Sequence, residues 1–330
     1  MIFPSWISPE IIPGLPIRWY GLMYIFAFGT AFIMYRKQVK ERNFPMSDDS
    51  LSSLFFWGIL GLLIGARLFS TLIYHGDSTY LKNPWLIFWP FQNGRFTGLQ
   101  GMSYHGGAFC GLLAVILFSK AKKYSFREIG DMFAAAIPLG FTFGRIGNFI
   151  NAELYGKITA SPLGMVFPEK STRLLSIHDP KVQEVAEKLG IDLTQTGSSL
   201  VNLPRHPSQL YQAFFEGIVL WVIVWSFRNR KPFKGFLVGL YFLGYGVIRF
   251  IIEFFREPDA HLGYRFANLT TGQILCLFMI AFGSIWMVAV SSLPDSKPVN
   301  AFSEEEQKQA QKEEAARERN QRRKMRKKLK

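Results

Sequence analysis

The fold is decided by residues 129–156, which read IGDMFAAAIPLGFTFGRIGNFINAELYG. The stretch begins as an apolar run that is long enough to cross a bilayer. Its end carries four polar residues within nine positions, namely Arg145, Asn148, Asn151 and Glu153. Each is costly in hydrocarbon, on the order of 2.5–3.5 kcal/mol for an arginine at a helix centre. A polar cluster at a membrane boundary therefore indicates a site that binds or transforms a polar group.

Seven apolar blocks of this kind run along the 330-residue chain. Each is close to the roughly 20 residues that span a bilayer, within a range of about 17–25. Backbone groups in lipid must hydrogen-bond internally, so the blocks are expected to be helices. The mean hydropathy of only +0.12 reflects dilution by polar segments. The sequence thus predicts an all-α polytopic membrane protein with seven transmembrane helices, at about 19–35, 51–74, 103–119, 129–150, 210–227, 235–255 and 272–291.

Lysine and arginine are distributed unequally between the short loops. The loops after the first, third and fifth blocks carry four basic residues each. The segment before the first block carries Arg18 alone, and the loops after the second and sixth blocks carry two basic residues each. Because basic loops stay in the cytoplasm, the N-terminus is predicted outside and the C-terminus inside. The polar cluster then lies at the outer end of its helix.

Outside the apolar blocks, the sequence predicts three further parts, namely an arm, a head and a charged tail. Residues 1–294 are predicted to form the transmembrane domain, with an outward arm at about 75–101 and a small extracytoplasmic head at about 151–209. Aromatic residues dominate the arm and suit a membrane interface, so we expect a helix lying on the outer leaflet, with a loop packed on other loops as the alternative. In the head, apolar residues spaced three and four apart predict a helix over about 180–190.

Residues 295–330 form a charged tail with 12 Lys and Arg against 7 Asp and Glu, expected to be disordered or helical. Nucleic acid is one partner for such a run, but anionic lipid is the simpler partner after a last span on the cytoplasmic side. We therefore expect membrane lipids and no nucleic acid as partners. Cys110 and Cys276 lie singly in separate apolar blocks without metal-ligand spacing, so no metal and no cofactor is predicted.

More polar residues lie where other blocks meet the outer side. Arg249 and Glu253 are spaced i, i+4 and share a helix face, either as a mutual ion pair or as part of an anion site. Converging arginines repel each other unless an anion or carboxylates lie between them, and arginine suits phosphate. His105, followed by two glycines, is either a general base or a helix-start histidine bonded to a neighbour. These residues describe an outward cavity for an anionic phospholipid.

Five blocks of sequence resemble the bacterial prolipoprotein diacylglyceryl transferase family. They are RWYGLMY at 18–24, GMSYHGG at 101–107, GRIGNFINAELYG at 144–156, RHPSQLY at 205–211, and GYG at 244–246 followed by Arg249, EFFR at 253–256 and Pro258-Asp259. The resemblance implies transfer of diacylglyceryl from phosphatidylglycerol to the lipobox cysteine in the signal peptide of a preprolipoprotein. A thioether forms and glycerol phosphate leaves, as the first step of lipoprotein maturation. It also implies the bacterial cytoplasmic (inner) membrane, with the active site facing the outer leaflet.

The resemblance further implies which residues bind the lipid. Arg145 and Arg249 would hold the phosphatidylglycerol headgroup, and positive charge there would stabilise the leaving phosphate. Asn151 and Gly156 lie in the same sequence block as Arg145 and would line the lipid site.

A second set of residues would support the chemistry in the same family. Tyr20 and Asn148 match positions that the family needs for activity, as Gly156 also does. Glu153 and Glu253 would orient the arginines and the polar network. His105 would assist deprotonation of the substrate thiol, since the thiolate is the nucleophile. Alternatively, the field of the arginines activates the thiol and no side chain acts as base.

The chain departs from the family pattern in two places, a longer segment at 92–100 and the long basic tail. Two other functions stay open. A membrane transporter or lipid scramblase would use the arginines to pass an anion, but it predicts polar residues in both leaflets. The other is a non-catalytic chaperone for lipoproteins. Removing one arginine from such a protein would weaken its binding to the lipoprotein but would not abolish formation of a covalent product.

Overall fold

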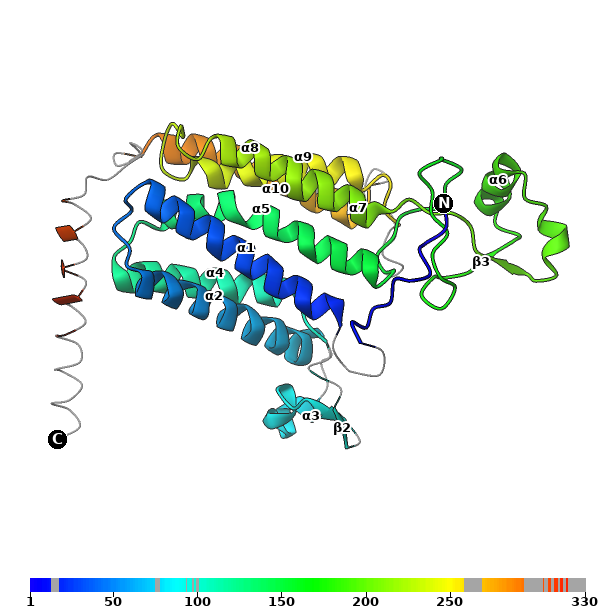
Figure 1. Ribbon diagram of the computed structural model, residues 1–330, viewed down its shortest axis with the longest axis horizontal. Helices are drawn as coiled ribbons and strands as arrows, with labels where there is room; N and C mark the ends of the chain where they lie inside the picture. The colour runs from blue at the N-terminus through cyan, green and yellow to red at the C-terminus, as the bar shows by residue number, and fades with distance from the viewer. Residues whose placement is uncertain are drawn as a thin grey trace. The chain divides into compact units, whose positions relative to one another are not determined.

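The structure is a computed structural model that describes residues 1–12, 18–74, 78–92, 94–96, 98, 101–257 and 269–293, with scattered residues of the tail. All seven apolar blocks are helical within these ranges (Figure 1). The helices are α1 (Trp19–Glu41), α2 (Asp48–Leu68) continued by the π-helix η1 (Phe69–Tyr74), α4 (Tyr104–Lys122), α5 (Phe126–Ile150), α7 (Ser208–Gln212) continued by the π-helix η4 (Ala213–Val219) and α8 (Leu220–Ser226), α9 (Phe236–Ile252) and α10 (Thr271–Ser291). The Pro258-Asp259 motif and the basic run at 322–330 lie outside the described residues.

Five helical stretches in the described ranges are long and apolar enough to cross a membrane. They are Asp48–Tyr74, Tyr104–Lys122, Phe126–Ile150, Ser208–Ser226 and Thr271–Ser291. Helix α9 is apolar but has 17 residues, which span about 26 Å at a rise of about 1.5 Å per residue. Helix α1 is longer but ends in a run of charged residues. The chain is therefore an all-α, multi-pass membrane protein, while the count of seven spans stays a prediction.

The described residues fall into two compact units, which lie within Met1–Tyr35 with Gly130–Asn300 and within Arg36–Ile129 with Ala301–Lys330. Helices α2 and α4 form the core of the second unit, where glycines allow a close approach of the two backbones. A Cβ added at Gly61 would come 2.9 Å from the Cys110 carbonyl oxygen. Arg42 and Glu128 form a buried ion pair of 2.7 Å in the same unit.

The arm belongs to the second unit, and residues 75–77, 93, 97, 99 and 100 within it lie outside the described residues. Its elements are the helix α3 (Ser78–Lys82), the 3-10 turn η2 (Pro84–Ile87) and a hairpin of β1 (Phe91–Gln92) with β2 (Arg95–Phe96). The expected arm helix is thus only five residues long, since the residue before Pro84 disfavours the helical conformation. Arg67 of α2 donates to the carbonyl oxygens of Ile87 and Gly101, which ties α2 to the arm.

The first unit is organised around α9, which packs on α10 and on α5. The N-terminus of α9 is capped by Asp131 of α5, whose carboxylate accepts from the Leu237 N–H at 2.9 Å. The same carboxylate lies 2.8 Å from the buried Lys231 ammonium. A Cβ at Gly246 of α9 would come 3.0 Å from the Cys276 carbonyl oxygen of α10. These contacts fix the helix that carries Arg249.

The head is also part of the first unit. Phe3, Ala152, Met165 and Phe167 bury a small apolar core there. The helix α6 (Pro180–Leu189) confirms the helix predicted from the apolar spacing. A short sheet of β3 (Leu175–Ser176) and β4 (Leu200–Val201) and the 3-10 turn η3 (Leu193–Thr196) complete the described elements of the head.

Candidate functional site

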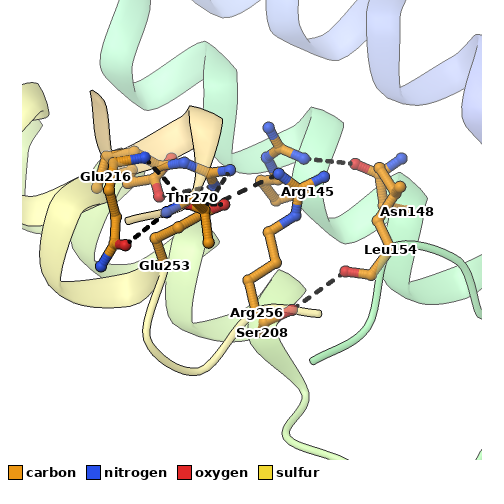
Figure 2. A network of polar contacts seen from close by, with 10 residues as sticks. Arg145, Asn148, Leu154, Ser208, Glu216, Glu253, Arg256 and Thr270 are labelled. Carbon is orange, nitrogen blue, oxygen red and sulfur yellow. Dashed lines mark hydrogen bonds and ion pairs between the residues drawn. The ribbon is translucent and has the colours of Figure 1, made fainter. Parts of the chain in front are cut away.

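The polar residues that end α5 form a hydrogen-bonded chain, which Figure 2 shows in part. Arg145 Nη1 donates to Asn148 Oδ1 at 3.2 Å, and Asn148 Nδ2 donates to Glu153 Oε1 at 2.8 Å. Asn151 Nδ2 donates to the same carboxylate oxygen at 3.4 Å. We call Arg145, Asn148, Asn151 and Glu153 the α5 network. Asn148 therefore connects the arginine to the carboxylate.

A strained turn brings Glu153 back towards the helix. Ala152 and Leu154 have left-handed backbones, with φ of 51° and 57°, at a cost of about 1–3 kcal/mol for each non-glycine residue. Gln209 Nε2 donates to the Glu153 carbonyl at 2.7 Å, and Ser208 Oγ donates to the Leu154 carbonyl at 3.1 Å. These two side chains from the start of α7 hold the turn in place.

A second group of charges surrounds Arg249 near the end of α9. Its Nη2 lies 2.9 Å from Glu253 Oε2, and its Nη1 lies 3.3 Å from Glu216 Oε1. Glu253 also accepts from Thr270 Oγ1 at 3.3 Å and lies 3.8 Å from Arg256 Nη1 (Figure 2). We call Arg249, Glu216, Glu253 and Arg256 the Arg249 cluster. The i, i+4 ion pair considered for Arg249 and Glu253 is confirmed.

Glu216 and Arg256 are the two members of this cluster that were not among the predicted site residues. Glu216 was recognisable in the sequence only as a polar residue near the start of the fifth apolar block. It lies buried in the π-helix η4, and π-helical segments often mark functional sites. Thr142 Oγ1 of α5 donates to the Ala213 carbonyl of this segment at 3.2 Å, which anchors the π-helix beside α5. The only signal in the sequence is a single carboxylate in an apolar block, and its pairing with Arg249 depends on the tertiary fold.

Gly156 and Tyr20 are fixed by close packing. The Gly156 N–H donates to the His206 carbonyl at 2.8 Å, and an added Cβ would collide with the Phe255 carbonyl oxygen. Glycine therefore allows the first residues of the head to pair with the chain just after α9. The Tyr20 ring packs on Gly147, where an added Cβ would come 3.0 Å from Tyr20 Cδ2. Tyr20 thus lies against the turn of α5 that carries the α5 network.

His105 opens α4 in the second unit, whereas the other eight predicted site residues lie in the first unit. Its Nδ1 lies 3.0 Å from Tyr74 Oη, and its ring meets the Tyr104 ring edge-on with centroids 5.7 Å apart. The bond to a neighbour that the sequence allowed is therefore present. The imidazole is exposed, and its role as a base stays a prediction.

The first unit leaves buried polar atoms without a hydrogen-bond partner among the described residues. Arg145 Nε and Asn151 Oδ1 are two of them. The Arg145 guanidinium lies over the Phe141 ring at 4.7 Å from its centroid. When a guanidinium group stacks on an aromatic ring, its N–H donors, which lie in the guanidinium plane, stay available to an anion. Two of these donors can bind a phosphate together. Buried polar groups in native proteins are normally satisfied, so these atoms have capacity to bond to water or to a ligand.

The α5 network and the Arg249 cluster both lie in the first unit. Figure 2 draws residues of the α5 network and of the Arg249 cluster in one close view, and Glu216 pairs with Arg249 at 3.3 Å. Arg145, Arg249 and Arg256 lie among the three carboxylates of Glu153, Glu216 and Glu253. An anion would therefore be held here by the hydrogen-bond donors of the guanidinium groups and not by an excess of positive charge. No group of three or more His, Cys, Asp or Glu that suits a metal ion occurs among the described residues.

Residues 8–289 match the family described as prolipoprotein diacylglyceryl transferase. Several relatives carry the name phosphatidylglycerol–prolipoprotein diacylglyceryl transferase, among them the three that follow. The protein of Treponema denticola is 53% identical, with 84% of this chain and 90% of the relative covered. That of Treponema pallidum is 51% identical, with 88% and 96% covered, and that of Chlorobaculum tepidum is 42% identical, with 85% and 89% covered.

Proposed function

Because the chain belongs to the prolipoprotein diacylglyceryl transferase family, we propose that it transfers diacylglyceryl from phosphatidylglycerol to a prolipoprotein cysteine. The cysteine sulfur attacks the glyceryl carbon that bears the phosphate. The carbon–oxygen bond breaks, and glycerol phosphate leaves with the bonding electrons. A thioether results, and the thiol proton passes to a base. The substrate cysteine is that of the lipobox in the signal peptide, so the reaction is the first step of lipoprotein maturation.

The observation that carries this proposal is the pair of arginines beside carboxylates, the half-buried Arg145 and the buried Arg249. Negative charge grows on the phosphate as it leaves, and fixed positive charge at that point lowers the barrier. Arg145, with unsatisfied donor capacity, binds the headgroup phosphate. Arg249, held by two carboxylates, stabilises the leaving group. Asn151 and Gly156 belong to the same lipid site, where Asn151 Oδ1 is a buried acceptor that a lipid hydroxyl can satisfy.

Three polar side chains position these arginines. Asn148 and Glu153 set the direction of the Arg145 guanidinium through the 3.2 Å and 2.8 Å hydrogen bonds of the α5 network. Glu253 does the same for Arg249, and its bond from Thr270 ties it to the start of α10. Preorganised charges of this kind need no rearrangement when the transition state forms. Tyr20 supports the network through its packing on α5.

Deprotonation of the thiol is assigned to His105. A neutral imidazole accepts a proton near neutral pH, and the Tyr74 hydroxyl beside Nδ1 can fix its tautomer by donating or accepting there. The alternative is that the arginine field lowers the thiol pKa and the proton leaves to water. A His105→Gln variant separates the two, since the field alone would keep most of the turnover.

We infer a topology of seven spans, with the N-terminus outside and the C-terminus in the cytoplasm. The unequal distribution of basic residues between loops supports it. Residues 1–294 would form the catalytic domain in the bacterial inner membrane, with the site facing the outer leaflet. The tail at 295–330 would bind anionic lipid.

The test is an assay for released glycerol phosphate. Purified protein is added to vesicles that contain phosphatidylglycerol, with and without a lipobox peptide. We expect release only when the peptide carries its cysteine. A transporter or scramblase would instead move labelled lipid between leaflets with no release, and that outcome would overturn the proposal.

A further inference from the structure

A buried amide lies on the helix formed by α7 and η4, which contacts both the α5 network and the Arg249 cluster. Gln212 ends α7 and is 1% exposed. Neither its Nε2 nor its Oε1 has a hydrogen-bond partner among the described residues. A primary amide buried in this way is destabilising for a folded protein unless something else bonds to it. The side chain is therefore poised for a ligand or for water that a ligand displaces.

The spacing along the helix places Gln212 between the two groups. One turn earlier, Gln209 donates to the Glu153 carbonyl of the α5 network at 2.7 Å. One turn later, Glu216 lies 3.3 Å from Arg249 Nη1. All three helix positions are buried, so they share one inward face. A ligand that reaches from one arginine group to the other passes this face.

The chemistry of the amide selects the class of ligand. A carboxamide donates two hydrogen bonds and accepts two, which complements an alcohol that also does both. An ammonium headgroup only donates hydrogen bonds, so it would leave the two N–H donors of the amide without an acceptor. When a lipid phosphate binds between the arginines, the group beside the phosphate is the headgroup alcohol.

We propose that Gln212 binds the glycerol hydroxyls of the lipid headgroup and is a specificity-determining residue. The inference rests on the proposed function, because it places the lipid phosphate at the arginines. Gln212 then distinguishes phosphatidylglycerol from lipids of equal charge that lack the hydroxyls.

The experiment compares two lipids that differ only in those hydroxyls. Phosphatidylglycerol and phosphatidyl-1-propanol with the same acyl chains are each offered with a lipobox peptide, and kcat/KM is measured from the modified peptide. We expect the wild-type protein to prefer phosphatidylglycerol by about 10–100-fold, since an unmet buried amide penalises the propanol lipid. Gln212→Met, of similar length but without the amide, should lose this preference mainly through slower use of phosphatidylglycerol.

Gln209→Met is the matched control. Its amide holds the Glu153 turn, so this variant should slow both lipids equally and keep the preference. If Gln212 had a purely structural role, Gln212→Met would also slow both lipids equally and keep the preference for phosphatidylglycerol. An unchanged preference in Gln212→Met therefore overturns the inference. If Gln212→Met does not fold, Gln212→Ala carries the same prediction. A wild-type protein that uses both lipids equally also overturns it, whereas no transfer from either lipid would contradict the proposed function instead.

Discussion

Asp131→Ala removes a carboxylate that several donors share at the N-terminus of α9. Its Oδ2 accepts from Lys231 Nζ and from the Gly235 N–H, both at 2.8 Å. Its Oδ1 accepts from the N–H groups of Leu237 and Val238 at 2.9 and 3.2 Å. Removing one partner of a buried ion pair costs about 3–5 kcal/mol, and loss of a helix cap costs about 1 kcal/mol more. We expect the free energy of unfolding to fall by about 4–6 kcal/mol.

Lys231→Met is the matched variant for this prediction. Three backbone N–H groups still stabilise the Asp131 carboxylate, so the expected loss is smaller, about 1–3 kcal/mol. Unfolding in micelles with a rising fraction of sodium dodecyl sulfate, followed by tryptophan fluorescence, gives both values. Equal losses in the two variants, or a loss below about 1 kcal/mol for Asp131→Ala, would refute the assignment of this carboxylate as the anchor of α9.

Three further predictions concern activity and pH. Arg145→Ala and Arg249→Ala should each abolish transfer, while membrane fractionation shows normal insertion. Truncation after Leu293 should leave turnover with vesicle-bound lipid largely intact. Burial, and then the charge of Lys157, lower the pKa of His206 below its ordinary 6.5. The unfolded chain then binds more protons than the folded chain just below pH 6.5, so thermal stability should fall as the pH drops below about 6.5. His206→Asn should weaken that dependence.

Each of these outcomes has a clear opposite. Normal thioether formation by either arginine variant would remove the anion site from the mechanism. A large drop in turnover on truncation, with insertion unchanged, would give the tail a part in catalysis. A stability profile that is equally steep in wild type and His206→Asn would assign the pH dependence to other groups.

Hydrophobicity was enough to predict the helices. Each of the seven apolar blocks became helical because backbone groups in lipid must bond within their own segment. The head helix followed from apolar spacing and is capped by Asp179 and Gly190. The arm was less predictable, since short elements around Pro84 depend on contacts such as those of Arg67 and not on a local period.

The site was predictable where its residues share one helix end, and not where it depends on contacts across the fold. The residue types at 145–153 indicated a polar cluster, and the i, i+4 spacing of Arg249 and Glu253 placed them on one helix face, with an ion pair as one of two interpretations. The pairing of Glu216 with Arg249 joins two helices and leaves no local pattern. The left-handed backbones at Ala152 and Leu154 were also hidden, because both residues ordinarily avoid that conformation.

The most direct test of the central claim is the mass of a lipobox peptide after incubation with the protein and phosphatidylglycerol. We expect a mass gain of one diacylglyceryl group on the cysteine. The gain should disappear when that cysteine is replaced by serine, or when Arg145→Ala replaces the wild-type protein. No mass gain from well-folded protein with intact lipid, or a gain that survives loss of Arg145, would contradict the account.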